Sequence, residues 1–295
     1  MLLDPQLNVA TFSLAARDPD TGDLGVAVAS KFLAVGAYVP SARAGVGAVA
    51  TQAHVNTTFA ERGLELLAAG KRPDEVVEAF RNADGNFAVR QFGIVSASGE
   101  SASYTGPNCH TWAGGVAGPN FAAQGNILAS QSVVDALVAG VNDLSRPFPE
   151  RLVAALAAAD AAGGDRRGRQ SAALLVVGAG KGYAGLTDKW IDLRVDDHPQ
   201  PITELGRLLG LHRVYLDKPS SPARDLNSSD IAALQAVLLR HGYSGDAVTG
   251  LWDEPTERAL EALFGVENLE ERWLTGPRMD PVAWDHIQKN LGGTE

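Results

Sequence analysis

The sequence predicts an α+β fold, in which helices enclose two antiparallel sheets as a four-layer α-β-β-α sandwich, followed by a small helical domain. Three observations favour this architecture. Short apolar runs separated by turn residues come in pairs, as in β-hairpins, and segments with helical spacing also come in pairs. A doubly wound parallel sheet would instead require strict alternation of strand and helix. Finally, a Pro- and Ser-rich stretch separates the last part of the chain.

The strands are predicted from apolar runs that end at turn residues. The first two flank Pro19 and Gly22 and are almost free of charge, so we expect this hairpin at the centre of a sheet. The predicted strands lie at 9–16, 24–30, 45–52, 91–96, 101–105, 171–177 and 190–195. Residues 106–126 are rich in Gly and Asn and are interpreted as a loop with one short strand.

The helices are predicted from apolar spacing of three and four residues and from their end signals. Pro73 begins a helix with acidic residues in its first turn, and Gly163 and Gly164 end another. The predicted helices lie at 57–69, 73–83, 132–142, 148–162, 201–215, 230–241 and 255–264. The expected organisation is a domain at 1–217, a linker at 218–225 and a helical domain at 226–295, and residues 1–217 are expected to fold alone.

Composition places the 295-residue chain among globular proteins, with 45% hydrophobic and 20% charged residues. A net charge of −10 disfavours nucleic acid and anionic membranes as partners. Cys109 is the only cysteine, so no intrachain disulfide can form. The start of the chain lacks signal-peptide features, and no apolar stretch is long enough to span a membrane. We therefore expect a cytoplasmic protein.

Thr11 is the first residue with a candidate chemical role, because it opens the first predicted strand. A threonine at a chain terminus can act as a nucleophile, with its own α-amine as the base. The pKa of an α-amine is near 8, so the amine can accept a proton at neutral pH. The alternative is an ordinary strand residue, since threonine favours strands.

Several long motifs of this chain resemble one family. They are TFSLAARDPDTGDLGVAVASKFLAVGAYVPSARAGVGAVATQ from Thr11, GNILA from Gly125, GGDRRGRQSAALLVV from Gly163 and DLRVDDHPQP from Asp192. Across residues 11–216 the chain is similar to DUF1028, a family of unknown function grouped with the N-terminal nucleophile (Ntn) hydrolases. The resemblance implies an Ntn-hydrolase-like sandwich in which Thr11 becomes the nucleophile once the chain is cleaved after Ala10.

Five residues are expected to form the catalytic site at the end of the first strand. Thr11 would be the nucleophile, and Lys31 would lower the pKa of its hydroxyl. Gln52 and Asn126 would donate hydrogen bonds to an oxyanion, and Asp165 would orient Lys31 or a substrate amine. Thr11→Ala is expected to abolish hydrolysis with little change in melting temperature. The structural alternatives are a solvated lysine, an asparagine in a turn and an Asp–Arg pair that holds a loop.

Further residues are expected to bind the substrate: Ser30, Asn56, Gln124, Arg167 and Gln170. Arg167 could hold a carboxylate through two hydrogen bonds. His54 is an alternative base, and Cys109 an alternative nucleophile without an evident base. The acidic group Asp192, Asp196, Asp197 and His198 lacks the spacing of a metal site, so neither metal nor cofactor is expected.

The segment 226–291, which contains LQAVLLRHGYSGDAVTGLWDEPTERALEALFGVENLEER, resembles a peptidoglycan-binding domain family that is often fused to DUF1028. Its alternative role is a packing or dimerisation module, and a homodimer is expected. Three functions remain open. The first is an amidohydrolase that cleaves a small amide or ureide-like C–N bond. The second is a non-catalytic binding protein on the same scaffold, and the third is a peptidoglycan-associated module. A small-molecule amide is the expected partner.

Overall fold

The computed structural model describes residues 11–218, 222–245 and 247–292. Its contacts divide the chain into two compact units, Met1–Leu209 and Gly210–Glu295. The first two residues of the strand predicted at 9–16 lie outside the described residues. No helix in the described part of the chain is long and apolar enough to cross a membrane.

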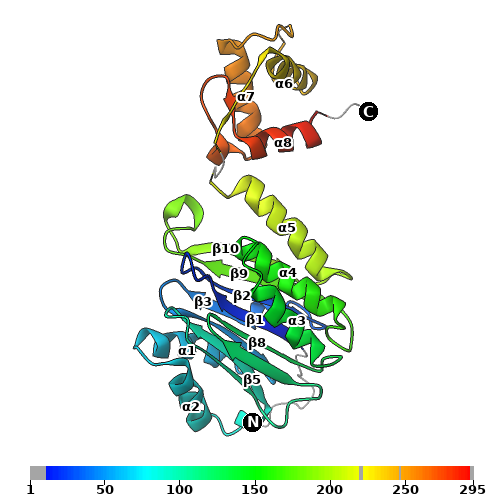
Figure 1. Cartoon of the computed structure of the whole chain (residues 1–295). Helices are drawn as coiled ribbons and strands as arrows, with labels where there is room; N and C mark the ends of the chain where they lie inside the picture. Colours follow the sequence, from blue (N-terminus) through cyan, green and yellow to red (C-terminus); the bar gives the residue numbers. More distant parts are fainter. Residues whose placement is uncertain (1–10, 219–221, 246, 293–295) are drawn as a thin grey trace. The chain divides into compact units, whose positions relative to one another are not determined.

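The first unit contains a six-stranded antiparallel sheet with the order β10-β9-β2-β1-β8-β7. Its strands are β1 (Thr11–Arg17), β2 (Leu24–Ser30), β7 (Gly114–Gly118), β8 (Phe121–Asn126), β9 (Ser171–Val177) and β10 (Lys189–Val195). The β1–β2 hairpin therefore lies at the centre of the sheet, as predicted (Figure 1). Both strands are buried along nearly their whole length, which explains why they carry so little charge.

The loop predicted at 106–126 is wrong in part, because this segment forms two strands, β7 and β8. Their residues are mostly Gly and Ala, whose small side chains carry little alternation of apolar and polar character. The prediction also missed β3 (Pro40–Arg43), which is too short for a clear pattern. Strand β3 is an edge strand of a four-stranded sheet with the order β3-β4-β5-β6. The other strands of this sheet are β4 (Gly47–Ala53), β5 (Arg90–Ser96) and β6 (Ser101–Thr105).

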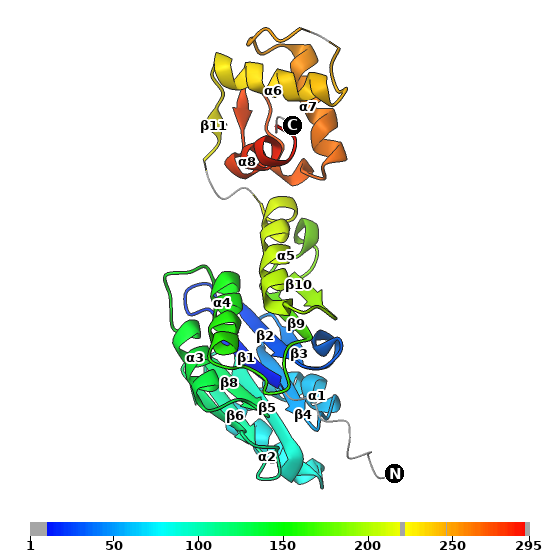
Figure 2. The ribbon, with the colours of Figure 1, turned by 90° about the vertical axis from the view of Figure 1, so that its right-hand side faces the viewer.

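Helices cover the outer face of each sheet (Figures 1 and 2). Phe59 of α1 (Thr58–Ala68) and Phe80 of α2 (Pro73–Ala83) pack with Phe92 against the four-stranded sheet. Leu137 of α3 (Ser132–Val141) and Leu152 of α4 (Phe148–Ala161) pack against the six-stranded sheet. The predicted antiparallel sheets and paired helices are confirmed.

The inner faces of the two sheets pack against each other, and their character changes along β1. Because side chains alternate along a strand, Phe12 and Leu14 face the helices while Thr11, Ser13 and Ala15 face the other sheet. Near Ala15 the interface is apolar and contains side chains such as Val26, Ala48 and Ala122. Near Thr11 the same interface is lined by polar side chains.

The second unit is built around one apolar core. Its elements are the end of α5 (Pro201–Tyr215), α6 (Ser228–Arg240), α7 (Glu254–Val266), α8 (Pro281–Asn290), and the two-residue strands β11 (Arg224–Asp225) and β12 (Arg278–Met279). Helix α8 and both strands were not predicted. Asp280 caps α8, since its carboxylate accepts hydrogen bonds from the Val282 and Ala283 N–H groups. Short 3-10 helices occur at 35–37, 87–89, 183–185 and 270–272.

Candidate functional site

Thr11 lies at the start of β1, between β2 and β8. The residue is fully buried, and its Oγ1 donates a hydrogen bond to Ser30 Oγ at 3.1 Å. In the register of the sheet, Thr11 is opposite Ser30 on one side and Asn126 on the other. Opposed residues on one face of a sheet have Cβ atoms about 4.5–5.5 Å apart. The sheet therefore brings two polar side chains to Thr11 from positions far apart in the sequence.

The facing sheet contributes Gln52 of β4, which is also fully buried. Its Nε2 donates to the Thr11 carbonyl oxygen at 3.1 Å and to Gln91 Oε1 at 2.9 Å. Its Oε1 accepts from Ser13 Oγ. Both N–H groups of Gln52 are thus committed, one of them to the backbone of Thr11. In this arrangement Gln52 holds Thr11 in place across the two sheets.

Gln91 of β5 is the centre of the network. Its Oε1 accepts hydrogen bonds from Gln52 Nε2 and, at 2.8 Å, from Asn126 Nδ2. Its Nε2 lies 2.7 Å from the Gly125 carbonyl oxygen and 2.9 Å from Thr105 Oγ1. A buried amide that bonds to groups on β4, β6 and β8 rigidifies the space between the sheets.

Asp165 and Lys31 meet at the end of β2, through the lysine backbone. Asp165 Oδ2 accepts from the Lys31 backbone N–H at 2.9 Å and forms an ion pair with Arg167 at 3.0 Å. The Asp165 side chain is 1% exposed, while the Lys31 side chain is exposed. Asp165 therefore holds the turn that follows Ser30, and the ammonium group of Lys31 is left to solvent. Arg167 is one-third exposed beside this carboxylate.

The remaining predicted residues are divided between this region and other places. Gln124 is buried beside Ser13, two positions along β8 from Asn126. The Gln170 backbone N–H donates to the Ser30 carbonyl, but its side chain binds Asp197. Asn56 makes its hydrogen bonds outside this network: its side chain accepts from the Thr58 N–H at the start of α1 and donates to Asp84. The structure thus gathers Thr11, Ser30, Gln52, Gln124 and Asn126 and places Asn56 elsewhere.

The pKa of His54, the alternative base, is lowered, whereas the pKa of Cys109, the alternative nucleophile, is raised. Burial lowers the pKa of His54, and the nearby His110 and Arg90 lower it further. Burial raises the pKa of the Cys109 thiol to about 11, although a hydrogen bond from Gly106 opposes this. The thiol lies 3.4 Å from the Arg90 carbonyl oxygen, to which it donates. A thiol in this state is a poor nucleophile at neutral pH.

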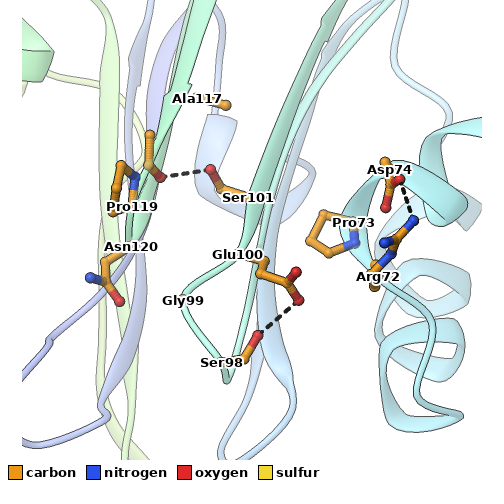
Figure 3. Close-up of a pocket in the computed structure, with 11 residues that line it drawn as sticks. Arg72, Pro73, Asp74, Ser98, Gly99, Glu100, Ser101, Ala117, Pro119 and Asn120 are labelled. Atoms are coloured by element: carbon orange, nitrogen blue, oxygen red, sulfur yellow. Dashed lines mark hydrogen bonds and ion pairs between the residues drawn. The ribbon is translucent and has the colours of Figure 1, made fainter.

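A cavity of about 590 Å³ opens at the other end of β1. Asn120, which lines it, accepts the backbone hydrogen bond of Arg17, the last residue of β1, and is therefore roughly 20 Å from Thr11. Figure 3 shows Arg72 paired with Asp74, and Glu100 with Ser98, on the wall of this cavity. Arg72 and Asp74 already pair with each other, and Glu100 accepts a hydrogen bond from Ser98, so the buried polar network near Thr11 is the stronger candidate site. Within the described residues, no cluster of three His, Cys, Asp or Glu side chains could hold a metal.

Sequence reasoning did not single out Ser13 and Gln91 as members of this network. Ser13 could have been found because it lies two positions after Thr11 on the same strand and therefore on the same face. Gln91 is an amide in a strand that continues as Phe92, Gly93 and Ile94. A buried amide in such a strand needs polar partners, and this requirement is the available signal.

Comparison with known proteins agrees with the sequence motifs. Residues 11–205 match the family described as "Family of unknown function (DUF1028)". Residues 215–285 match the family described as "Putative peptidoglycan binding domain". No curated protein matches the chain.

A crystal structure of a DUF1028 protein from Silicibacter pomeroyi is similar to this chain. The two chains are 32% identical, with a TM-score of 0.63, and the similarity covers 69% of this chain and 89% of that one. The family match covers well over half of the present chain, and the similar structure carries the same family assignment. The chain therefore belongs to the DUF1028 family of unknown function, with a peptidoglycan-binding-like domain at 215–285.

Proposed function

We propose that this protein is an Ntn-type amidohydrolase, in which removal of residues 1–10 makes Thr11 both the nucleophile and, through its α-amine, the base. The observation that carries the proposal is that two independent features coincide at one residue. The family match begins at Thr11, and Thr11 is also the residue whose hydroxyl lies buried in the polar network between the sheets. Two facing sheets with helices on their outer faces are consistent with an Ntn-hydrolase-like sandwich.

The proposed reaction uses the hydroxyl and the amine of one residue. Thr11 Oγ attacks the carbonyl carbon of the substrate amide as the α-amine takes the hydroxyl proton. The resulting ammonium gives this proton to the leaving nitrogen as the C–N bond breaks. Water then hydrolyses the acyl ester, again with the amine as the base. The expected substrate is a small amide or ureide-like compound.

The surrounding groups have distinct roles in this proposal. Ser30 Oγ holds the Thr11 hydroxyl, and Gln52 holds the Thr11 carbonyl. Lys31 follows Ser30 at the same strand end, and its exposed ammonium group is the proposed partner of a developing oxyanion once substrate is bound. Asp165 holds the backbone at Lys31, and Arg167 beside it is the proposed partner of a substrate carboxylate.

Replacement of Thr11 tests the proposal. In a panel of small amides and ureides, Thr11→Ala is expected to abolish turnover, because both the hydroxyl and its placement are lost. Thr11→Ser keeps a hydroxyl and is expected to retain measurable turnover. The variant Asp74→Asn is the control, since Asp74 is exposed on the wall of the cavity at the other end of β1. Turnover is measured by release of the amine product.

The N-terminus of the purified protein is determined by intact-mass spectrometry at the same time. A chain that turns over the substrate while still carrying residues before Thr11 would contradict the proposed base. A chain that keeps those residues and has no turnover would instead favour the alternative, a binding protein on the same scaffold.

For the second unit, the match at 215–285 supports a separate proposal, that it recruits the protein to peptidoglycan. Co-sedimentation of the purified chain with insoluble peptidoglycan tests this proposal. If the chain stays in the supernatant, a packing or homodimerisation role for this unit is favoured.

A further inference from the structure

The orientation of Gln91 follows from the backbone that surrounds it. Its Nε2 lies 2.7 Å from the Gly125 carbonyl oxygen and 3.3 Å from the Gly114 carbonyl oxygen. Carbonyl oxygens only accept hydrogen bonds, so the NH₂ group of Gln91 must face them. Its Oε1 must therefore face Gln52 and Asn126, and both of these amides must present NH₂ groups to it.

This orientation determines which atom of Asn126 is left over. Since Asn126 Nδ2 donates to Gln91, its Oδ1 points away from Gln91, and this oxygen is buried without a hydrogen-bond partner among the described residues. Asn126 as a whole is fully buried. A buried acceptor left unpaired costs about 1–3 kcal/mol, so the site is built to receive a donor at this point.

A second unpaired acceptor in the network, Gln124 Oε1, does not offer the same opportunity. Gln124 Nε2 donates to Ser13 Oγ at 2.7 Å, which turns Oε1 toward Gly93. A Cβ atom on Gly93 would lie only 2.1 Å from this oxygen, so the backbone of β5 occupies the space in front of it. Asn126, in contrast, is the residue opposite Thr11 in the sheet.

We infer that Asn126 accepts a hydrogen bond from the α-amine of Thr11, and that Gln91 is the positioning residue that turns the Asn126 oxygen toward it. The inference rests on the proposed function, because only a chain cleaved before Thr11 has this amine. One N–H of the amine binds Asn126 Oδ1, which directs the nitrogen lone pair toward the Thr11 hydroxyl. Asn126 is thus an acceptor for the base, in contrast to the oxyanion donor expected from the sequence.

The pKa of the α-amine reports this contact, because an acceptor stabilises the ammonium form. Other charged and titratable groups near this end of the sheets are fixed by their own contacts or lie on other faces. Lys31 is exposed, Asp165 is paired with Arg167, and Arg90 is paired with Asp84 on the helix side of β5. The imidazoles of His54 and His110 follow β4 and precede β7, with ring centroids 6.2 Å apart.

The test measures the α-amine pKa in the full purified chain by trace acetylation over a pH range, with mass spectrometry of the N-terminal peptide. Asn126→Leu removes the acceptor and is expected to lower the pKa by about one unit or more, since a hydrogen bond to a charged group is lost. Gln91→Met is expected to lower it in the same direction. Gln124→Met, the same substitution elsewhere in the network, is expected to leave the α-amine pKa unchanged.

Asn126→Asp keeps the acceptor oxygen and separates the two roles of Asn126, even if the apolar variants fold poorly. It is expected to raise the α-amine pKa and to retain turnover at pH values above the raised pKa. A loss of turnover by about 10²–10³ at every pH would show that Asn126 is an oxyanion donor, which overturns the inference. An unchanged pKa in Asn126→Leu would also overturn it. Peptides that begin upstream of Thr11 would instead contradict the proposed function itself.

Discussion

The proposed nucleophile Thr11 is as deeply buried as Gln52 and Asn126, the amides around it. Thr11 is fully buried at its strand end, so the little change in melting temperature that the sequence predicts for Thr11→Ala needs revision. Its hydroxyl also binds Ser30, so Thr11→Ala should cost about 1 kcal/mol of stability as well as the nucleophile. The effect on melting temperature is therefore small but measurable, and Thr11→Ser separates it from the effect on turnover.

Cys109 gives a second prediction at the residue scale. Its pKa is raised from 9.0 to about 11, so at pH 7.5 the thiolate fraction should be about 100-fold lower than in a thiol with the usual pKa. The folded protein should react with iodoacetamide about 100-fold more slowly than the chain unfolded in urea. The rate should rise tenfold per pH unit up to about pH 11.

The comparison with the unfolded chain is unambiguous because Cys109 is the only cysteine. Equal rates in the folded and unfolded chain would contradict the raised pKa. They would also return Cys109 to consideration as a nucleophile.

At the scale of elements, a buried ion pair joins the segment after α2 to the start of β5 in the four-stranded sheet. Arg90 at the start of β5 pairs with Asp84 after α2, at 2.8 Å, and their side chains are 5% and 9% exposed. Arg90 also binds the His54 carbonyl after β4, and Asn56 binds Asp84. Burial alone would raise the pKa of Asp84, but hydrogen bonds from Arg90 and Asn56 lower it below its usual value.

Asp84→Asn leaves the guanidinium of Arg90 buried without an opposite charge. The free energy of unfolding should fall by about 3–5 kcal/mol, as for other buried pairs with one partner removed. Asp74→Asn is the matched control, because Asp74 pairs with Arg72 on the surface, where their side chains are 67% and 60% exposed. This substitution should change the free energy of unfolding by less than about 1 kcal/mol. Urea denaturation at pH 7 measures both.

Because the folded-state pKa of Asp84 is depressed, its stabilisation is present at neutral pH and is lost as pH falls through that lowered pKa. The difference in the free energy of unfolding between wild type and Asp84→Asn should therefore become smaller in acid. A difference that stays constant down to pH 3 would show that the effect is not ionic.

At the scale of the whole chain, the two units divide inside α5, between Leu209 and Gly210. Leu205 and Leu209 belong to the core of the first unit, whereas Val214 and Tyr215 pack on the core of the second. Within the second unit, Arg272 binds the carbonyl oxygens of Arg213 and Val214. Its guanidinium also pairs with Asp280, and both side chains are at most 3% exposed. The end of α5 thus supplies part of the second core.

Two fragments of the second unit should differ in stability for this reason. A fragment of residues 210–295 keeps the two carbonyl partners of Arg272, whereas a fragment of residues 218–295 leaves the buried guanidinium with fewer acceptors. The shorter fragment should be less stable by at least about 1–3 kcal/mol, measured by urea denaturation.

Equal stability of the two fragments would show that the end of α5 contributes nothing to this core. The longer fragment is also the appropriate one for peptidoglycan co-sedimentation, because it contains the whole of the family match at 215–285.

The sequence by itself determined the local elements of this protein. The charge-free runs at 11–16 and 24–30, the helix signals at Pro73 and the Gly163–Gly164 stop all lie in neighbouring residues, and the structure confirms the elements they predict. The family motifs at 11–52, 125–129, 163–177 and 192–201 are likewise continuous stretches. The sequence did not reveal β3, α8, β11 or β12, and it revealed β7 and β8 only in part, because Gly and Ala give no periodic pattern there.

Only the tertiary structure decided what surrounds Thr11 and what each amide there can do. The register of β1 places Asn126 opposite Thr11. The packing of the two sheets brings Gln52 to Thr11 and Gln91 to Asn126, and no spacing in the sequence predicts these contacts. The backbone carbonyls of Gly114 and Gly125 then set the orientation of Gln91, and through it that of Asn126. An amide can donate or accept, and the choice depends on partners that are distant in the sequence, because hydrogen bonding is satisfied in space.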